Sequence, residues 1–151
     1  MDMTGEERIA APRAAVWAAL NDPEVLRPCI PGCDRLEWIS PTQLAARVKI
    51  KIGPLSASFS GDIALSNMNP PVSYTISAEG RGGLAGFAKG AADVSLHEDG
   101  GETILRYVIR AEAGGRIAKL GGKLVDAAAA KLARNFFADF TAAAQAKQAT
   151  G

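Results

Sequence analysis

The chain has 151 residues, of which 48% are hydrophobic and 22% are charged, and its 17 basic side chains nearly balance its 16 acidic ones. This length and composition predict one globular domain over residues 1–151 with a hydrophobic core. A nucleic-acid-binding protein usually has a strong basic excess and exposed aromatic residues, so the near-neutral charge argues against that class and we expect no nucleic-acid partner.

The N-terminal third predicts a strand followed by two short helices. Its first ten residues are acidic and lack an apolar run, so they do not form a secretory or transit peptide, and we expect a cytoplasmic protein. Alternating polar and apolar residues from Thr4 to Ile9 predict an opening edge strand. A helix is expected over residues 14–20, because the preceding Pro12 suits a first helical turn. A second short helix is expected to begin at Pro23.

The segment PCIPGC, residues 28–33, contains two prolines and a glycine and therefore predicts a rigid bend that ends the second helix. Its cysteines, Cys29 and Cys33, are interpreted as packing residues, because a cysteine pair in a cytosolic chain seldom forms a structural disulfide. Zinc would need two more ligands, and the single histidine, His97, falls in a polar segment that predicts an exposed turn. We therefore expect no metal site and no cofactor.

Alternation with a period of two begins after Asp34 and predicts a series of antiparallel strands, each with one apolar face. The clearest strands are residues 44–52 and 55–65, separated by a turn at Gly53-Pro54. Further strands are predicted over residues 74–79, 94–97 and 103–113.

The segment GRGGLAGFAKG, residues 80–90, contains five glycines and could be taken for a phosphate-binding loop. It lacks the Lys-Ser/Thr ending of a P-loop, and it precedes a strand instead of a helix. Glycines in a strand pattern more often mark bulges or bends, so the segment predicts a strongly curved sheet.

The last predicted element is a long helix from Arg116 to Ala146, which Gly114-Gly115 separates from the sheet. Its apolar residues recur every three or four positions and form one stripe, which we expect to cover the curved sheet: Ile117, Leu120, Leu124, Ala128, Leu132, Phe136 and Phe140. Residues 103–151 carry eight basic against three acidic side chains. That excess suggests affinity for an acidic partner or an anionic lipid surface, although a solvated charged face is the commoner explanation.

Several sequence segments, in the same order as these elements, resemble the CoxG family of carbon monoxide dehydrogenase subunits, within the START-like, or SRPBCC, helix-grip superfamily. They are PRAAVWAALNDPEVL at residues 12–26, CIPGC at 29–33, the strand pair around Gly53-Pro54, the glycine-rich segment 80–90 and Gly114-Gly115. The resemblance implies a single START-like domain with an α+β helix-grip fold. In that fold a curved antiparallel sheet of about six to seven strands wraps around the C-terminal helix, and two short helices follow the first strand.

The resemblance also implies a function. A helix-grip fold implies a cavity between sheet and helix for an apolar or amphipathic small molecule. The family implies an accessory role beside a molybdenum hydroxylase of the carbon monoxide dehydrogenase type, with peripheral contact at the inner face of the cytoplasmic membrane.

We therefore predict a carrier for a lipid-like ligand, with a respiratory quinone as the best candidate, because aromatic and aliphatic walls suit a flat ring with an apolar tail. Room for the ligand is expected beside small inward residues, namely Ala57, Gly61, Ala78 and Ala128. The predicted ligand-binding residues are Ile30, Phe59, Tyr74, Leu84, Phe87, Tyr107, Leu124, Leu132, Phe136 and Phe140. The alternative is that these side chains fill a solid core.

Two other functions remain as alternatives. An enzyme would need an inward acid, base or nucleophile, and the pattern provides none. Cys33 has no histidine partner, and the acidic strand residues fall at outward positions: Asp62, Glu79, Asp93 and Glu112. We therefore predict no catalytic residue and no enzymatic activity. The remaining alternative is a ligand-free subunit that docks its partner enzyme at the membrane.

Overall fold

A computed structural model describes residues 1–150 of the chain, with side chains described for residues 1–147. The elements are, in chain order, β1 (Asp2–Ile9), α1 (Arg13–Leu20), α2 (Pro23–Cys29), β2 (Cys33–Ser40), β3 (Gln43–Ile52), β4 (Leu55–Asn69), β5 (Ser73–Arg81), the 3-10 helix η1 (Gly83–Ala85), β6 (Phe87–Asp99), β7 (Glu102–Gly114), the 3-10 helix η2 (Ala118–Leu120) and α3 (Gly122–Thr150).

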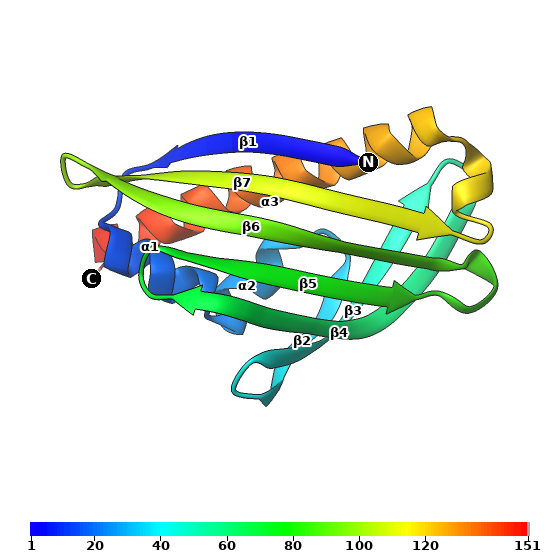
Figure 1. The fold of residues 1–151 in the computed structure, drawn as a ribbon, viewed down its shortest axis with the longest axis horizontal. Coiled ribbons are helices and arrows are strands. Elements are labelled where there is room, and N and C mark those ends of the chain that lie inside the picture. The colour runs from blue at the N-terminus through cyan, green and yellow to red at the C-terminus, as the bar shows by residue number, and fades with distance from the viewer. Residues whose placement is uncertain (151) are drawn as a thin grey trace.

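The strands form one seven-stranded antiparallel sheet in the order β1-β7-β6-β5-β4-β3-β2. Consecutive strands from β2 to β7 are neighbours, and β1 completes the sheet by pairing with β7. Figure 1 shows the sheet curving around α3, with α1 and α2 under one end. The predicted α+β helix-grip arrangement is therefore confirmed.

The long helix bridges the two sides of this sheet. The backbone of α3 lies close to β1, β3, α1 and α2. It approaches β4–β7, the strands beneath it, less closely. Among the described residues, none of the helices combines the length and the hydrophobicity that a transmembrane span requires.

Two hydrophobic clusters occupy opposite ends of the molecule. The larger one, which we call the closed end, joins α1, α2 and the second half of α3 to the sheet around Ile9, Val16, Leu105 and Phe140. The smaller one, at the open end, contains Ile52, Phe59, Ala85 and Ile117. The β3–β4, β5–β6 and β7–α3 connections lie at the open end, at the right of Figure 1.

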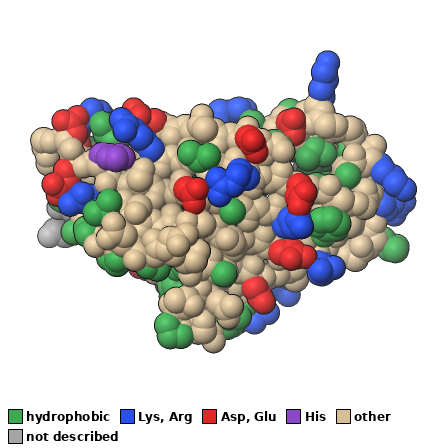
Figure 2. Space-filling view, viewed as in Figure 1, with side chains coloured by type: hydrophobic (Ala, Val, Ile, Leu, Met, Phe, Trp, Pro, Cys, Tyr) green, Lys and Arg blue, Asp and Glu red, His purple; other side chains and the backbone are tan. Residues whose placement is uncertain are grey.

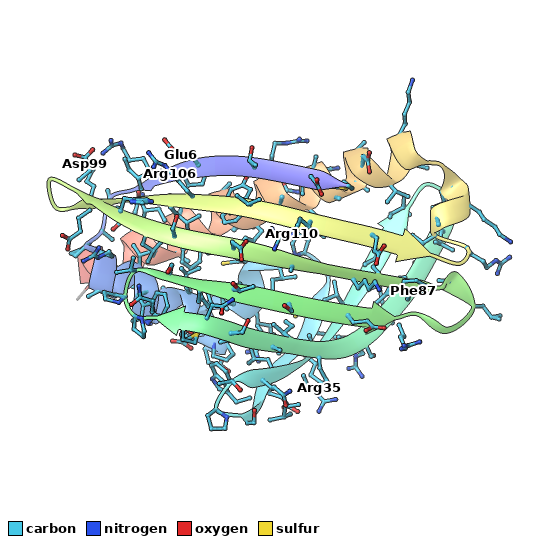
Figure 3. The ribbon with its side chains drawn as sticks, viewed as in Figure 1. Glu6, Arg35, Phe87, Asp99, Arg106 and Arg110 are labelled. Carbon is cyan, nitrogen blue, oxygen red and sulfur yellow. The ribbon has the colours of Figure 1, made fainter. Side chains whose placement is uncertain are left out.

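The outward face of the sheet is polar. Glu6 accepts a 2.8 Å hydrogen bond from Arg106, and Arg110 lies 3.2 Å from Asp93; Figure 3 labels both arginines and Glu6 on this face. Glu79 and Glu112 also form ion pairs, with Arg81 and Lys89. The predicted outward placement of Glu79, Asp93 and Glu112 is confirmed.

Two helix boundaries differ from the prediction. The last helix begins at Gly122 and not at Arg116, because Gly115 and Gly121 adopt φ angles of 78° and 99° that a helix cannot contain. Ile117 therefore belongs to a connecting segment. The second helix continues through Pro28 to Cys29, since a proline in the last turn removes only one helical hydrogen bond.

Two further segments also differ. His97 lies within β6, where it is exposed, and the turn falls later, at Gly100-Gly101. The glycine-rich segment forms a turn instead of a bulge, with η1 between β5 and β6. Gly86 is required there, because a Cβ at this position would collide with the carbonyl of Gly114 on β7.

Candidate functional site

The strand register leaves a shallow region on the inner face of the sheet. Across β5, β6 and β7 it aligns two neighbouring rows of small residues, Ala78–Gly90–Ala111 and Gly80–Ala88–Ala113. Nearer the closed end, the row Tyr74–Val94–Tyr107 provides larger side chains. Large side chains therefore fill the inner face of the sheet near the closed end, and small residues leave a hollow on it toward the open end.

The part of α3 above this hollow is only partly packed, through Ala128, against the hydrophobic cluster at the open end. Leu124 and Leu132 are 41% and 40% exposed, and the buried side chains of the helix begin only at Ala133. The second half is buried along the line Ala133, Phe137, Phe140 and Ala144. One helix thus contributes to a core with its second half and covers a cavity with its first.

The inner chamber of this cavity has a volume of about 360 Å³. Its walls come from α2, the inner face of the sheet and α3, and they include Ile30, Trp38, Tyr74, Tyr107, Phe136 and Phe137. No charged side chain lines this chamber among the described residues. The lining excludes charged ligand groups and favours apolar ones.

The outer chamber, of about 640 Å³, lies between the end of β3 and the first half of α3. Ala111 and Leu132 line both chambers, so the two adjoin. Exposed charged side chains line the outer one, so the cavity opens toward solvent there: Lys49, Lys51 and Lys131, and the ion pair of Lys89 with Glu112. The whole space is therefore apolar at its inner end and bordered by positive charge at its opening.

Tyr107 is held against the sheet edge. Its ring stacks on Phe137 with centroids 4.2 Å apart and planes 8° apart. Its hydroxyl occupies the space that a Cβ at Gly5 of β1 would need, so the ring covers this edge glycine. Burial, and to a lesser extent the nearby carboxylate of Glu7, raises the pKa of Tyr107.

Tyr74 is more deeply buried, with 3% of its surface exposed. Trp17 meets its ring edge-on, with centroids 5.1 Å apart and planes at 63°. Burial raises the pKa of the Tyr74 hydroxyl, which stays protonated at physiological pH. Within the described part of the chain no hydrogen bond ties this hydroxyl to another residue, and its oxygen is not among the fully enclosed unpartnered atoms, which belong to Arg13 and Thr141.

The structure brings together five of the ten residues predicted to bind a ligand. Those lining the cavity are Ile30, Tyr74, Tyr107, Leu132 and Phe136. Two others lie in hydrophobic clusters: Phe140 is fully buried at the closed end, and Phe59 packs at the open end, with its ring over Gly82.

The remaining three lie outside the cavity. Leu84 is 85% exposed in η1, and Leu124 lies beside the turn at Gly53. Phe87 takes an outward position at the start of β6, where its ring covers Gly114 and not the helix (Figure 3). The inward positions of this strand are the even-numbered ones, because Val94 and Leu96 are buried in the core.

Sequence reasoning missed Phe137 and Trp38. Phe137 was overlooked because the predicted stripe passes through Phe136, one position earlier; the spacing Ala133–Phe137–Phe140–Ala144 is the signal that could have found it. The predicted small inward residues Ala78 and Ala128 line the outer chamber. Gly61 has another role, since a Cβ there would collide with the carbonyl of Glu79.

Neither cysteine is bonded to the other. Cys29 is buried and donates to the carbonyl of Val25 at 3.2 Å, and Cys33 donates to the carbonyl of Arg35. Burial raises the pKa of both thiols. Among the described residues, no three His, Cys, Asp or Glu side chains are grouped so as to hold a metal ion.

Comparison with known proteins gives one family and one fold. The family model of CoxG, a carbon monoxide dehydrogenase subunit, matches residues 5–145. The crystal structure of a conserved protein from Geobacillus kaustophilus is 28% identical, with a TM-score of 0.88 and 95% of each chain covered. No curated protein matches.

More distant structures share the fold alone. The structure of Ara h 8.0201 is 13% identical with a TM-score of 0.69, covering 97% of this chain and 98% of that one. The Zhui aromatase/cyclase from Streptomyces sp. R1128 is 12% identical with a TM-score of 0.65, covering 96% and 93%.

Proposed function

This chain belongs to the CoxG family of carbon monoxide dehydrogenase subunits, and we propose that it is a carrier that holds a hydrophobic or amphipathic small molecule between its sheet and α3. The ligand is lipid-like, with a respiratory quinone as the best candidate. The carrier is an accessory to a molybdenum hydroxylase of the carbon monoxide dehydrogenase type. The observation that carries the proposal is the two-chambered cavity, whose inner chamber is lined without a charged side chain.

The size of the cavity supports this ligand class. A cavity of ~150 Å³ lined by apolar side chains holds one benzene ring, so the inner chamber has room for a ring system about twice that size. The outer chamber adds space for an apolar tail that leads toward solvent.

Ligand extraction and a cavity-filling variant test the proposal. Mass spectrometry of organic extracts from gently purified protein should detect a co-purified lipid or quinone. Ala111→Phe places a ring where the two chambers meet and should abolish binding of an added quinone in calorimetric titration. Ala91→Phe, on the outward face of β6, is the matched control and should bind normally. Repeated absence of ligand, with no binding on titration, would leave only a docking role.

We also propose that the open end makes peripheral contact with the membrane. Leu84 projects from η1, and Arg116, Lys119 and Lys123 are exposed nearby without an ion pair among the described residues. The backbone of Ile117 donates to Ala85 at 2.8 Å, which holds the β7–α3 connection beside η1. Figure 2 shows basic side chains gathered at this end of the molecule.

Vesicle binding tests this contact. Each basic residue near an anionic leaflet contributes ~1 kcal/mol, so three of them with one inserted leucine give reversible attachment. Sedimentation with phosphatidylglycerol-containing vesicles should fall strongly for Leu84→Ser and for the double variant Lys119→Glu/Lys123→Glu. The matched controls Ile39→Ser and Arg134→Glu change exposed residues elsewhere and should bind like the parent protein. Equal losses in the controls would refute this contact surface.

A further inference from the structure

Tyr74 is the polar group that distinguishes one end of the cavity from the other. The inner chamber is lined almost entirely by hydrocarbon and aromatic rings, and its few polar side chains differ in their surroundings. The Nδ2 of Asn21 is engaged, because it donates to the carbonyl of Trp17 at 2.9 Å. The hydroxyl of Tyr107 lies over Gly5 at the sheet edge. Tyr74 differs from both residues: its side chain is deeply buried, and its hydroxyl neither bonds a carbonyl nor covers a glycine.

The Tyr74 oxygen is not sealed in by protein, because the fully enclosed side-chain atoms without a partner among the described residues belong to Arg13 and Thr141. The hydroxyl lies in a chamber whose walls are almost entirely apolar, so few partners are within its reach. Removing a hydroxyl from water without replacing its hydrogen bond costs free energy, so buried hydroxyls in proteins are normally paired. The described residues that surround Tyr74 in the chamber include Leu65, Ile76 and Val94, which have no side-chain acceptor. Trp17 packs edge-on against the ring and supports its position.

We infer that the Tyr74 hydroxyl donates a hydrogen bond to an acceptor oxygen, such as a ring carbonyl, of the carried molecule. This inference rests on the proposed carrier function and assigns the ligand an orientation. The oxygen-bearing ring enters first and lies in the inner chamber among Tyr74, Phe136 and Phe137. The apolar tail then passes Ala111 and Leu132 into the outer chamber.

The inference also states which molecules bind poorly. A hydrocarbon of the same shape leaves the hydroxyl unpartnered and loses the advantage of the hydrogen bond. A charged head group is disfavoured, because no charged side chain lines the inner chamber to offset its desolvation and the Met1 ammonium already donates to the carbonyl of Ala111. The selected class is therefore neutral, apolar molecules with a carbonyl at the inserted end.

A matched pair of probes tests this. The probes are 2,3-dimethyl-1,4-naphthoquinone and 2,3-dimethylnaphthalene, which have the same bicyclic frame and differ in the two carbonyl oxygens. Methyl groups at both reactive ring positions prevent addition of Cys29 or Cys33. Equilibrium dialysis should give the quinone a dissociation constant about five- to tenfold lower than that of the hydrocarbon, as expected for one hydrogen bond.

Tyr74→Phe removes the hydroxyl and keeps the ring. It should weaken quinone binding about fivefold and change hydrocarbon binding less than about twofold. Ser58→Ala, which removes an exposed hydroxyl from the outward face of β4, is the control and should leave the preference between the probes unchanged. Because no partner within the chain is lost, free Tyr74→Phe protein should melt at the same temperature as the parent or higher. A large drop in that temperature would reveal an internal partner and overturn the inference.

The outcomes separate the two proposals. If the parent protein binds both probes equally, or Tyr74→Phe keeps the full preference for the quinone, the inference fails and the carrier function stands. If the parent protein binds neither probe, the carrier function fails and the inference fails with it.

Discussion

The two halves of α3 cover the same sheet in different ways. At the closed end, Phe137 and Phe140 are buried among side chains from α1, α2 and five strands of the sheet. At the open end, the helix passes over rows of alanine and glycine, and Leu124 and Leu132 remain partly exposed. The same amphipathic helix is thus part of a core in one half and the cover of a cavity in the other.

This difference separates stability from binding. Burial of large apolar side chains is the main source of folding free energy, and those of α3 are concentrated at the closed end. The open end can then remain hollow without unfolding the domain. Substitutions at the two ends should therefore change different properties.

The largest expected effect is on the core residue Phe140. Because this side chain is fully buried, Phe140→Ala should lower the free energy of unfolding by ~3–5 kcal/mol. Leu132→Ala, on the same helix but 40% exposed, should lower it by less than ~1 kcal/mol. Urea denaturation of both variants measures the difference. Similar losses would mean that the first half of α3 is packed as tightly as the second.

Enlarging a small side chain should also destabilise the closed end more than the open end. Ala144 is 3% exposed at the closed end, and Ala144→Leu should cost ~1–3 kcal/mol because the core has no room for the added atoms. Ala78 lines the outer chamber, so Ala78→Leu should leave the melting temperature unchanged or raise it. A destabilised Ala78→Leu variant would contradict a hollow open end.

A smaller effect concerns the hydrogen bond that attaches the β1–α1 connection to β7. The fully buried Thr103 donates from Oγ1 to the carbonyl of Ala11 at 2.7 Å. Thr103→Val preserves the shape and removes this donor, so unfolding should become easier by ~1–2 kcal/mol. Thr4→Val, at an exposed position of β1, is the control and should stay within ~0.5 kcal/mol of the parent in the same denaturation experiment. An unchanged Thr103→Val variant would show that the closed end depends on packing alone.

Much of the fold could be predicted from the sequence, because strand alternation and helix periodicity are local signals. The strands around Gly53-Pro54 and the helix start at Pro23 follow from such signals and are confirmed. The start of α3 could not be predicted in the same way. The apolar period runs back through Leu120 to Ile117, and only the backbone angles of Gly115 and Gly121 reveal that the helix begins later.

The cavity was harder to predict than the fold. Alternation shows which face of one strand is apolar, but register decides which residues of neighbouring strands lie side by side. The rows containing Gly90 and Ala88 become a hollow only because β5 and β7 place further small residues beside them. Leu84 shows the converse error, since an apolar residue in a glycine-rich turn resembles a core residue in sequence and is exposed in the structure.

The smallest expected effect on stability comes from a residue on the outward face of the sheet, and it should be the same for variants at either end. The Thr75 hydroxyl donates to Asp93 at 2.8 Å, and this bond, followed by the contact with Arg110, lowers the pKa of Asp93 below its ordinary value of 3.8. A lowered pKa stabilises the fold above about pH 3.8, and the stabilisation is lost as the pH falls through the folded-state value. Asp93→Asn should therefore cost stability at neutral pH, within the ~0.2–1 kcal/mol of exposed ion pairs, and nothing at low pH.

Denaturation of the parent protein and Asp93→Asn between pH 7 and about pH 3 measures this loss. A difference that persists unchanged at the acidic limit would refute the assignment. Asp93 lies outside both hydrophobic clusters, so its protonation should change the free energies of unfolding of Phe140→Ala and Leu132→Ala by the same amount. The gap between those two variants should then be independent of pH, because it arises from buried apolar surface at one end of α3 and its absence at the other.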